Sequence, residues 1–169
     1  MPPASDRLRL RPFHDADAPF VLDLVTQPSW RRWIGDRGER TEADALATLR
    51  DRWNAHHDAH GFWVVERRED GAALGICGLV TRPGLDVPDL GFAFLPEHWG
   101  RGYAREAARA TAGWARDVLG LGRLVAIVTP GNAPSVRVLE VVGMRYAGAA
   151  ELPGESEPVD LYEVEWGGA

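Results

Sequence analysis

A glycine-rich turn between an apolar strand and an alanine-rich helix is the feature of this sequence that most restricts its fold. Residues 90–104 read LGFAFLPEHWGRGYA. The strand ends at Pro96, which lacks the N–H that strand pairing requires. Gly100 and Gly102 then permit the tight bend that opens a helix over 102–119. The free N–H groups and the dipole at the start of this helix make an anion site that suits a pyrophosphate.

The rest of the chain alternates strand and helix patterns in an order typical of a mixed α/β fold. Apolar alternation or continuous apolar runs predict strands over 7–12, 62–66, 73–80, 89–95, 124–128, 144–150 and 159–166. Helical spacing predicts helices over 16–26, 42–58, 102–119 and 133–142, with Asp15, Thr41 and Asn132 as N-caps. We therefore expect one α+β domain over 1–169, with about seven mostly antiparallel strands and about four helices.

Composition and charge narrow the classes of partner. The formal net charge of −6 argues against nucleic acid as the main partner and agrees with a cationic substrate such as an amine. No run of residues is long and apolar enough to span a bilayer, and the N-terminus lacks the apolar core of a signal peptide. We expect a cytoplasmic protein with no membrane partner.

The cysteine and histidine content gives no strong metal signal. Cys77 is the only cysteine, which excludes an internal disulfide and a structural thiolate metal site. It lies in an apolar strand without a basic neighbour, so we expect it in the core and not as a nucleophile. His56 and His60 are four residues apart, as zinc ligands on one helix face are. They fall at a predicted helix C-terminus, where histidine is favoured anyway, so we expect no metal.

Five short motifs together resemble one enzyme family. Residues 99–104, WGRGYA, resemble the acyl-CoA pyrophosphate signature Q/R-x-x-G-x-G/A of the GNAT N-acetyltransferases, with Trp99 in place of Gln or Arg. The further motifs are RLRLRPF at 7–13, DLGF at 89–92, NAPS at 132–135 and GM at 143–144. In this order and spacing they look like the RimJ/RimL-type branch, which acetylates ribosomal-protein N-termini and, in many relatives, small amines. The resemblance covers residues 7–166.

The resemblance implies a GNAT fold whose sheet splays between its fourth and fifth strands. It also implies that the unpaired backbone of the fourth strand binds the pantetheine arm of acetyl-CoA, while the glycine turn binds the pyrophosphate. The residues expected to bind acetyl-CoA are Phe92, Ala93, Phe94, Leu95, Trp99, Gly100, Arg101, Gly102, Tyr103, Ala104, Arg105, Asn132 and Ser135. No metal is expected to take part.

Amine acetylation needs a base for the ammonium and benefits from a proton donor for the departing thiolate. Asp89 matches the position of a glutamate in the RimL-like pattern, so it is the candidate base, and a strand-end salt bridge is the alternative. Ser135 matches the family's serine that hydrogen-bonds the CoA sulfur, and an ordinary first-turn serine is the alternative. Leu139 stands where other GNAT branches place a tyrosine.

Three aromatic residues are candidates for contact with the acceptor. Trp30 and Trp33 lie in the segment that shapes the acceptor site in this family, although core packing would also explain them. Tyr162 on the last strand is similar in position to residues that face that site.

The sequence thus predicts an acetyl-CoA-dependent N-acetyltransferase that acts on a primary amine of a small molecule or a protein N-terminus. The amine would attack the thioester directly in a ternary complex. A non-catalytic acyl-CoA-binding module is the alternative, and monomer and homodimer both stay open. A nucleotide-binding protein is a poor match, because the chain has no G-x-x-x-x-G-K-[ST] pattern.

Overall fold

The computed structural model describes residues 2–53 and 61–167, which form a mixed α/β fold around one seven-stranded sheet. The strands are β1 (Leu8–Arg11), β2 (Phe62–Arg67), β3 (Ala73–Val80), β4 (Asp89–Phe94), β5 (Arg123–Val128), β6 (Arg145–Ala150) and β7 (Val159–Glu165). Their order across the sheet is β1-β2-β3-β4-β5-β7-β6. All neighbours are antiparallel except β4 and β5, so the expected mostly antiparallel mixed sheet is confirmed.

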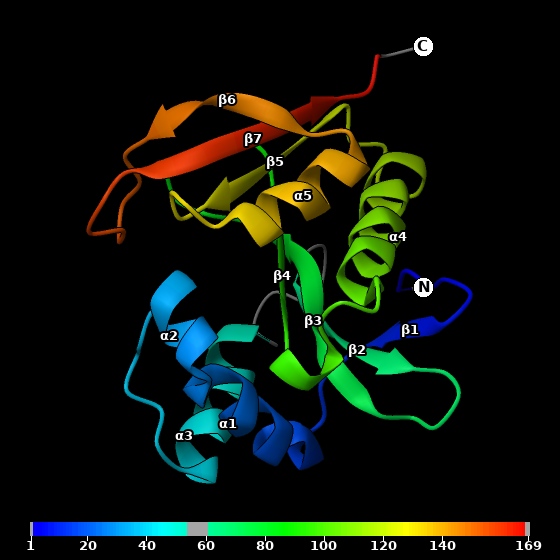
Figure 1. Cartoon of the computed structure of the whole chain (residues 1–169), viewed down its shortest axis with the longest axis vertical. Coiled ribbons are helices and arrows are strands. Elements are labelled where there is room, and N and C mark those ends of the chain that lie inside the picture. The colour runs from blue at the N-terminus through cyan, green and yellow to red at the C-terminus, as the bar shows by residue number, and fades with distance from the viewer. Residues whose placement is uncertain (1, 54–60, 168–169) are drawn as a thin grey trace.

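Within the described residues, five α-helices flank the sheet, where about four were expected (Figure 1). They are α1 (Ala18–Thr26), α2 (Pro28–Trp33), α3 (Glu42–Thr48), α4 (Tyr103–Asp117) and α5 (Ala133–Val142). The additional helix is α2, which follows α1 after a single residue, Gln27. Pro28 occupies the first position of α2, where its missing N–H costs nothing.

Two predicted helix starts have different outcomes. The capping box at α3 is confirmed: the Thr41 amide donates to the Asp44 carboxylate at 2.8 Å, and the Asp44 amide donates to Thr41 Oγ1 at 3.2 Å. Asp15 is not an N-cap. It lies inside a short 3-10 helix, η1 (Asp15–Asp17), whose N-cap is His14, and the Asp17 carboxylate accepts from the His14 amide at 2.8 Å.

The helix predicted over 42–58 is α3 followed by a π-helical turn, η2 (Leu49–Trp53). Residues 54–58 of that predicted helix lie outside the described residues, as does the pair His56 and His60.

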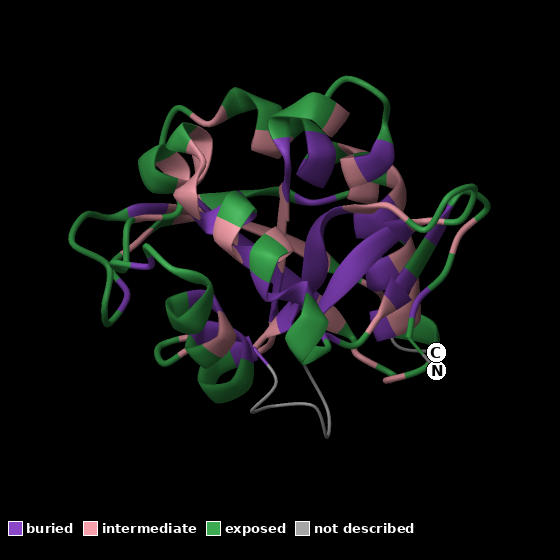
Figure 2. Cartoon of the chain, turned by 90° about the horizontal axis from the view of Figure 1, so that it is seen from below, coloured by how far each residue is buried: buried purple, intermediate pink, exposed green. Residues whose placement is uncertain are grey.

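Apolar side chains form one cluster on each face of the sheet. One cluster joins the sheet to α4 and α5, and the other joins it to α1, α3 and η2. Figure 2 shows buried residues concentrated in the central strands and exposed residues on the outer sides of the helices. Cys77 is fully buried, with its Sγ 3.3 Å from Thr111 Oγ1, and burial raises the pKa of its thiol to about 12. The expected core role of Cys77 is therefore confirmed.

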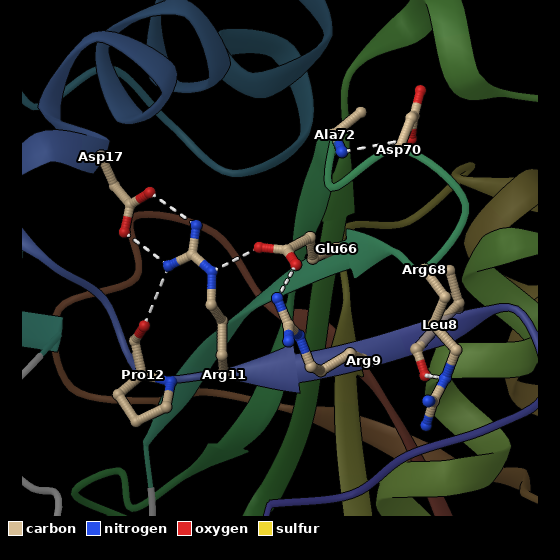
Figure 3. Close-up of polar contacts among 9 residues, drawn as sticks. All are labelled: Leu8, Arg9, Arg11, Pro12, Asp17, Glu66, Arg68, Asp70 and Ala72. Atoms are coloured by element: carbon tan, nitrogen blue, oxygen red, sulfur yellow. Dashed lines mark hydrogen bonds and ion pairs between the residues drawn. The ribbon is translucent and has the colours of Figure 1, made fainter.

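A network of ion pairs, here called the β1 clasp, ties the first strand to its neighbours and consists of Arg9, Arg11, Asp17 and Glu66 (Figure 3). The Arg11 guanidinium donates to both Asp17 oxygens at 2.8 and 2.9 Å and to Glu66 at 2.6 Å. Burial alone would raise the pKa of Glu66, but hydrogen bonds from Arg11 and Arg9 outweigh it and lower that pKa. Both carboxylates of the clasp are thus held in their ionised form.

The sheet separates between β4 and β5, as the resemblance implied. Among the described residues the two strands pair at one position, Asp89 with Val125, where the Val125 amide donates to the Pro88 carbonyl at 3.4 Å. In Figure 1, β5, β6, β7 and α5 form the upper part of the molecule, and α1–α3 lie in the lower part. This divergence leaves part of the β4 backbone without a strand partner.

Candidate active site

A cleft of about 820 Å³ opens where β4 and β5 separate. We call one wall the α4–α5 side, because the N-terminal turns of these two helices form it. We call the opposite wall the α1–α3 side, because it lies on the part of the molecule that contains these helices. Its residues come from α2, η2, the start of β2 and the loop after β3. Asp89 and the following residues of β4 line the cleft between the two walls.

The backbone of β4 is only half available to a ligand. In an antiparallel pair, alternate residues direct their N–H and C=O groups toward the neighbouring strand. The Leu95 amide donates to the Leu74 carbonyl at 3.0 Å, so Leu95 and, two residues earlier, Ala93 face β3. The expectation that these two backbones are unpaired is therefore wrong. Phe92 and Phe94 direct their backbone groups toward the splay.

Trp99 has a role that the sequence did not reveal. Its indole Nε1 donates to the Phe94 carbonyl at 2.9 Å, while 55% of its surface stays exposed in the cleft lining. The hydrogen bond fixes the ring at the end of β4, beside the glycine turn. The Phe94 carbonyl oxygen has a second lone pair, so it can still accept a bond from a ligand.

The glycine turn has the backbone conformation that its sequence predicts. Gly100 and Gly102 have φ values of +73° and +80°, a region that other residues adopt only with strain. Gly102 is the N-cap of α4 and provides no side-chain cap, so the first amides of the helix stay open toward the cleft. Tyr103, Ala104 and Arg105 line the cleft beside these glycines.

The two arginines of this turn lie in different places. Arg105 lines the cleft, whereas Arg101 is not among the described residues of the lining. The Arg101 carbonyl accepts from Arg7 Nη1 at 3.1 Å, and Arg7 is also paired with Glu106 at 2.6 Å. The Arg101 backbone therefore helps to anchor the N-terminal segment to α4.

Ser135 and Asn132 lie together at the start of α5, as predicted. The Asn132 side chain caps the helix by accepting from the Ser135 amide at 3.4 Å, and both residues line the cleft. The Ser135 side chain is half-buried. Leu139, one turn further along α5, is buried and also lines the cleft, so the wall there is apolar.

Asp89 is almost fully buried, at 1% exposure, yet it lines the cleft at the point of the splay. Both of its oxygens accept from Arg82 Nε, at 3.0 and 3.1 Å. Burial raises the pKa of Asp89 above its usual value, and the nearby Arg82 guanidinium opposes that rise. The strand-end salt bridge that the sequence left open is present, and the same carboxylate belongs to a residue that lines the cleft.

Trp30 and Trp33 both line the cleft on the α1–α3 side. Trp30 packs against Trp53 with ring centroids 6.0 Å apart, so it also contributes to the core. The Trp33 carbonyl accepts from Thr129 Oγ1 at 2.9 Å, which links the end of α2 to the segment after β5. The two tryptophans thus form an aromatic wall that is joined to the opposite half of the sheet.

Tyr162 does not lie in the cleft. Among the described residues of the lining, β7 contributes Val159 and not Tyr162. Tyr162 packs on the α4–α5 face of the sheet, edge-on to Tyr146 with ring centroids 5.7 Å apart. The lining therefore gives no support to a contact between Tyr162 and the acceptor.

Sequence reasoning also missed three arginines of the α1–α3 side, namely Arg37, Arg52 and Arg82. They come from three separate segments and match no motif. Within residues 2–53 and 61–167, no three His, Cys, Asp or Glu side chains are grouped as a metal site would need. Over the same residues, no helix combines the length and apolar character needed to cross a membrane.

Comparison with known proteins agrees with this geometry. The profile of the acetyltransferase (GNAT) domain family matches residues 7–145. The uncharacterized N-acetyltransferase YnaD of Bacillus subtilis is 31% identical over 167 residues, covering 95% of this chain and 96% of that protein. The crystal structure of a GNAT-family acetyltransferase from Bacillus anthracis superposes with a TM-score of 0.82 at 26% identity, over 98% of both chains.

A second solved structure shows the same fold with ligands present. Spermidine N-acetyltransferase from Vibrio cholerae, in complex with CoA and spermine, has a TM-score of 0.77 at 18% identity and covers 95% of this chain and 96% of its own. The splayed sheet, the glycine turn and the match over most of the sequence lead to one conclusion: the chain belongs to the GNAT acetyltransferase family.

Proposed function

We propose that this protein transfers an acetyl group from acetyl-CoA to a primary amine of a small molecule or a protein N-terminus, within a ternary complex. The observation that carries the proposal is the cleft at the splay. It brings together the free β4 backbone, the open amides of the α4 turn, Ser135 and Asp89. This set of groups suits a long peptide-like ligand with an anionic end and a reacting centre between two proton-transfer groups.

The residues of the α4–α5 side fit acetyl-CoA. The pantetheine arm contains two amides, which match the backbone groups of Phe92 and Phe94 that face the splay. The amides from Gly102 to Arg105 and the dipole of α4 suit the pyrophosphate, and the Arg105 side chain adds positive charge. When bound, acetyl-CoA supplies an acetyl group activated as a thioester.

Asp89 and Ser135 have complementary parts in this proposal. Asp89 takes a proton from the acceptor ammonium, directly or through a water molecule, and so provides a neutral amine. The amine attacks the acetyl carbonyl, and the C–S bond breaks after the C–N bond has formed. Ser135 gives its hydroxyl proton to the leaving sulfur and is reprotonated from solvent. The raised pKa of Asp89 makes it a stronger base than an exposed aspartate.

The cofactor assignment can be tested with a matched pair of charge reversals on α4. Arg105 lines the cleft, and Arg109, one helical turn further, is exposed and donates to the Val141 carbonyl at 3.4 Å. We expect Arg105→Glu to weaken acetyl-CoA binding by about tenfold or more, measured by calorimetry, because it places a carboxylate beside the phosphates. Arg109→Glu should leave the affinity unchanged. Equal affinities for both variants would contradict the pyrophosphate site.

Release of the CoA thiol in the presence of a broad panel of amines and peptides tests the transfer itself. Turnover with any primary amine supports the enzyme. Binding of acetyl-CoA without turnover across the panel would favour the non-catalytic alternative, for which the ion pair between Asp89 and Arg82 is the one supporting observation.

The role of Ser135 can be tested separately. We expect Ser135→Ala to lower kcat by about 100-fold, because it removes a positioned proton donor. Acetyl-CoA affinity should change little, since the Ser135 amide and the Asn132 cap are retained. An unchanged kcat would mean that Ser135 is only a first-turn helix residue.

A further inference from the structure

Three guanidinium groups line the α1–α3 side of the cleft, and we call them the arginine cluster: Arg37, Arg52 and Arg82. Arg37 lies in the segment between α2 and α3, Arg52 in η2, and Arg82 just after β3. The fold brings these distant segments to one wall of the cleft. The Arg82 guanidinium also holds Asp89, so the cluster lies directly beside the candidate base.

In the part of the chain that the structure describes, Asp89 is the one carboxylate that is hydrogen-bonded to the arginine cluster. Arg82 uses only Nε for Asp89, and its Nη1 is 3.9 Å from Glu155, too far for a hydrogen bond. The Arg52 Nη1 is 3.8 Å from Glu39, whose carboxylate already accepts from Thr48 Oγ1 at 2.9 Å. Within the described part of the chain, Arg37 has no ion pair.

The three positive groups also repel one another. Burial lowers the pKa of Arg52, and the positive charges of Arg37 and Arg82 lower it further, whereas Glu39 opposes them. Among the described residues, most of their N–H donors have no hydrogen-bond partner, and all three side chains line the cleft. Such an arrangement suits an anion, above all a carboxylate or another group that accepts two parallel hydrogen bonds.

The remaining surface of this wall is aromatic. Trp53 lies at the centre of a cluster, with ring centroids 6.0 Å from Trp30 and 5.9 Å from Phe62. All three rings line the cleft, as does Trp33. Two further carboxylates, Asp51 and Glu155, are also part of the lining. The wall thus offers an apolar surface next to a patch that contains both signs of charge.

We propose that the acceptor is a primary amine that also carries a carboxylate, as an amino acid with an apolar side chain does. Arg52 and Arg37 bind the carboxylate, Asp89 receives the amine, and the aromatic wall packs against the apolar side chain. This inference rests on the proposed acetyltransferase function. It also disfavours polyamines as acceptors, because a second ammonium beside the arginine cluster would be repelled by its positive charges.

The experiment uses amines that differ only in the carboxylate. Leucine, phenylalanine and tryptophan are compared with isoamylamine, phenethylamine and tryptamine, with spermidine as a polyamine. Binding to the CoA-saturated protein is measured by calorimetry, and kcat/KM by thiol release. We expect at least one amino acid to bind about tenfold or more tightly than its decarboxylated partner, because charge-assisted hydrogen bonds to arginine are lost in the latter.

Matched variants connect this preference to the arginine cluster. Arg52→Gln and, separately, Arg37→Gln should reduce the preference for the carboxylate over the decarboxylated amine to about threefold or less. Arg50→Gln is the control, since Arg50 is exposed and paired with Asp15 outside the cleft. Circular dichroism verifies that each variant is folded. Because two separate variants are made, the test can still be carried out if one of them fails to fold.

The possible failures are distinguishable. If no amino acid binds more tightly than its partner, or if spermidine is preferred, the carboxylate inference is wrong while acetyl transfer to amines still supports the proposed function. If no amine of any kind is acetylated, the proposed function is wrong, and the binding data still decide whether the arginine cluster recognises carboxylates. A preference that survives both Arg52→Gln and Arg37→Gln would assign carboxylate recognition to other residues and overturn the inference.

Discussion

Arginines serve opposite purposes in the β1 clasp and in the arginine cluster. In the clasp, Arg11 donates to two carboxylates at 2.6 to 2.9 Å, and Arg9 shares one of them. In the cluster, the nearest carboxylate to Arg52 is 3.8 Å away among the described residues. The number of bonded partners therefore separates an arginine that holds the fold from one that is available to a ligand.

The pKa directions follow the same division. The hydrogen bonds of Arg11 overcome burial and lower the pKa of Glu66, so the clasp gains from its charges. In the cluster, burial and neighbouring guanidiniums lower the pKa of Arg52, so its charge is a cost to the unliganded protein. A bound anion would offset that cost. The clasp would gain nothing from an anion, because Arg11 is already paired with two carboxylates.

The largest expected effect on stability comes from removing the central arginine of the clasp. Arg11→Met should lower the free energy of unfolding by about 3 kcal/mol, since it leaves two buried carboxylates without their shared donor. The value is at the low end for a buried pair because 21% of the Arg11 side chain is exposed. Urea denaturation measures the loss, and calorimetry should show unchanged affinity for acetyl-CoA. A weaker affinity would mean that the clasp is coupled to the site.

The next prediction concerns Asp89, the carboxylate that is hydrogen-bonded to Arg82 of the arginine cluster. Asp89→Asn should lower kcat by about 100-fold, because the amide cannot accept the proton of the acceptor ammonium. In the wild type, the rate should also fall as the pH drops through the raised pKa of Asp89, when the carboxylate becomes protonated. This acid limb should be absent from the pH profile of the variant. A wild-type-like rate would leave Asp89 as a structural partner of Arg82 only.

Acid pH should weaken the clasp by a smaller, graded amount. Because the pKa of Glu66 is lowered from 4.5, its ion pairs contribute fully above that pH and are lost as the pH falls through the lowered value. The stability of the wild type should thus fall more steeply below pH 4.5 than that of Arg11→Met. Parallel curves from urea denaturation at several pH values would contradict the assignment.

The smallest expected effect is on the stability of a variant in the arginine cluster, for comparison with Arg11→Met in the clasp. Arg52→Gln should change the free energy of unfolding by less than about 0.5 kcal/mol, since it removes an exposed residue without a close ion pair. Urea denaturation gives this value directly. A loss comparable to that of Arg11→Met would erase the distinction between the two groups of arginines.

Local signals in the sequence account for much of the fold and for half of the candidate site. The glycine turn, the Thr41 capping box and the Asn132 cap are all short-range features, and each is present in the structure. Their physical causes act within a few residues, so periodicity and residue type predict them. The resemblance to a known family then supplied the splay between β4 and β5.

The other half of the site depends on long-range packing. The arginine cluster forms only when three distant segments pack together: the segment after α2, η2 and the loop after β3. No spacing of residues in the sequence predicts this contact. Tyr162 illustrates a related difficulty. Strand alternation predicts that neighbouring residues face opposite sides, but it does not say which side faces the cleft.

The single pair between β4 and β5 also has a dynamic consequence. The two parts of the sheet lack the ladder of hydrogen bonds that normally transmits rigidity from strand to strand, so their relative orientation depends on helices and on a few side chains. A ligand lying along Phe92 and Phe94 would act as the missing strand. Amide hydrogen exchange at these residues should slow when acetyl-CoA binds, and the melting temperature should rise with ligand concentration.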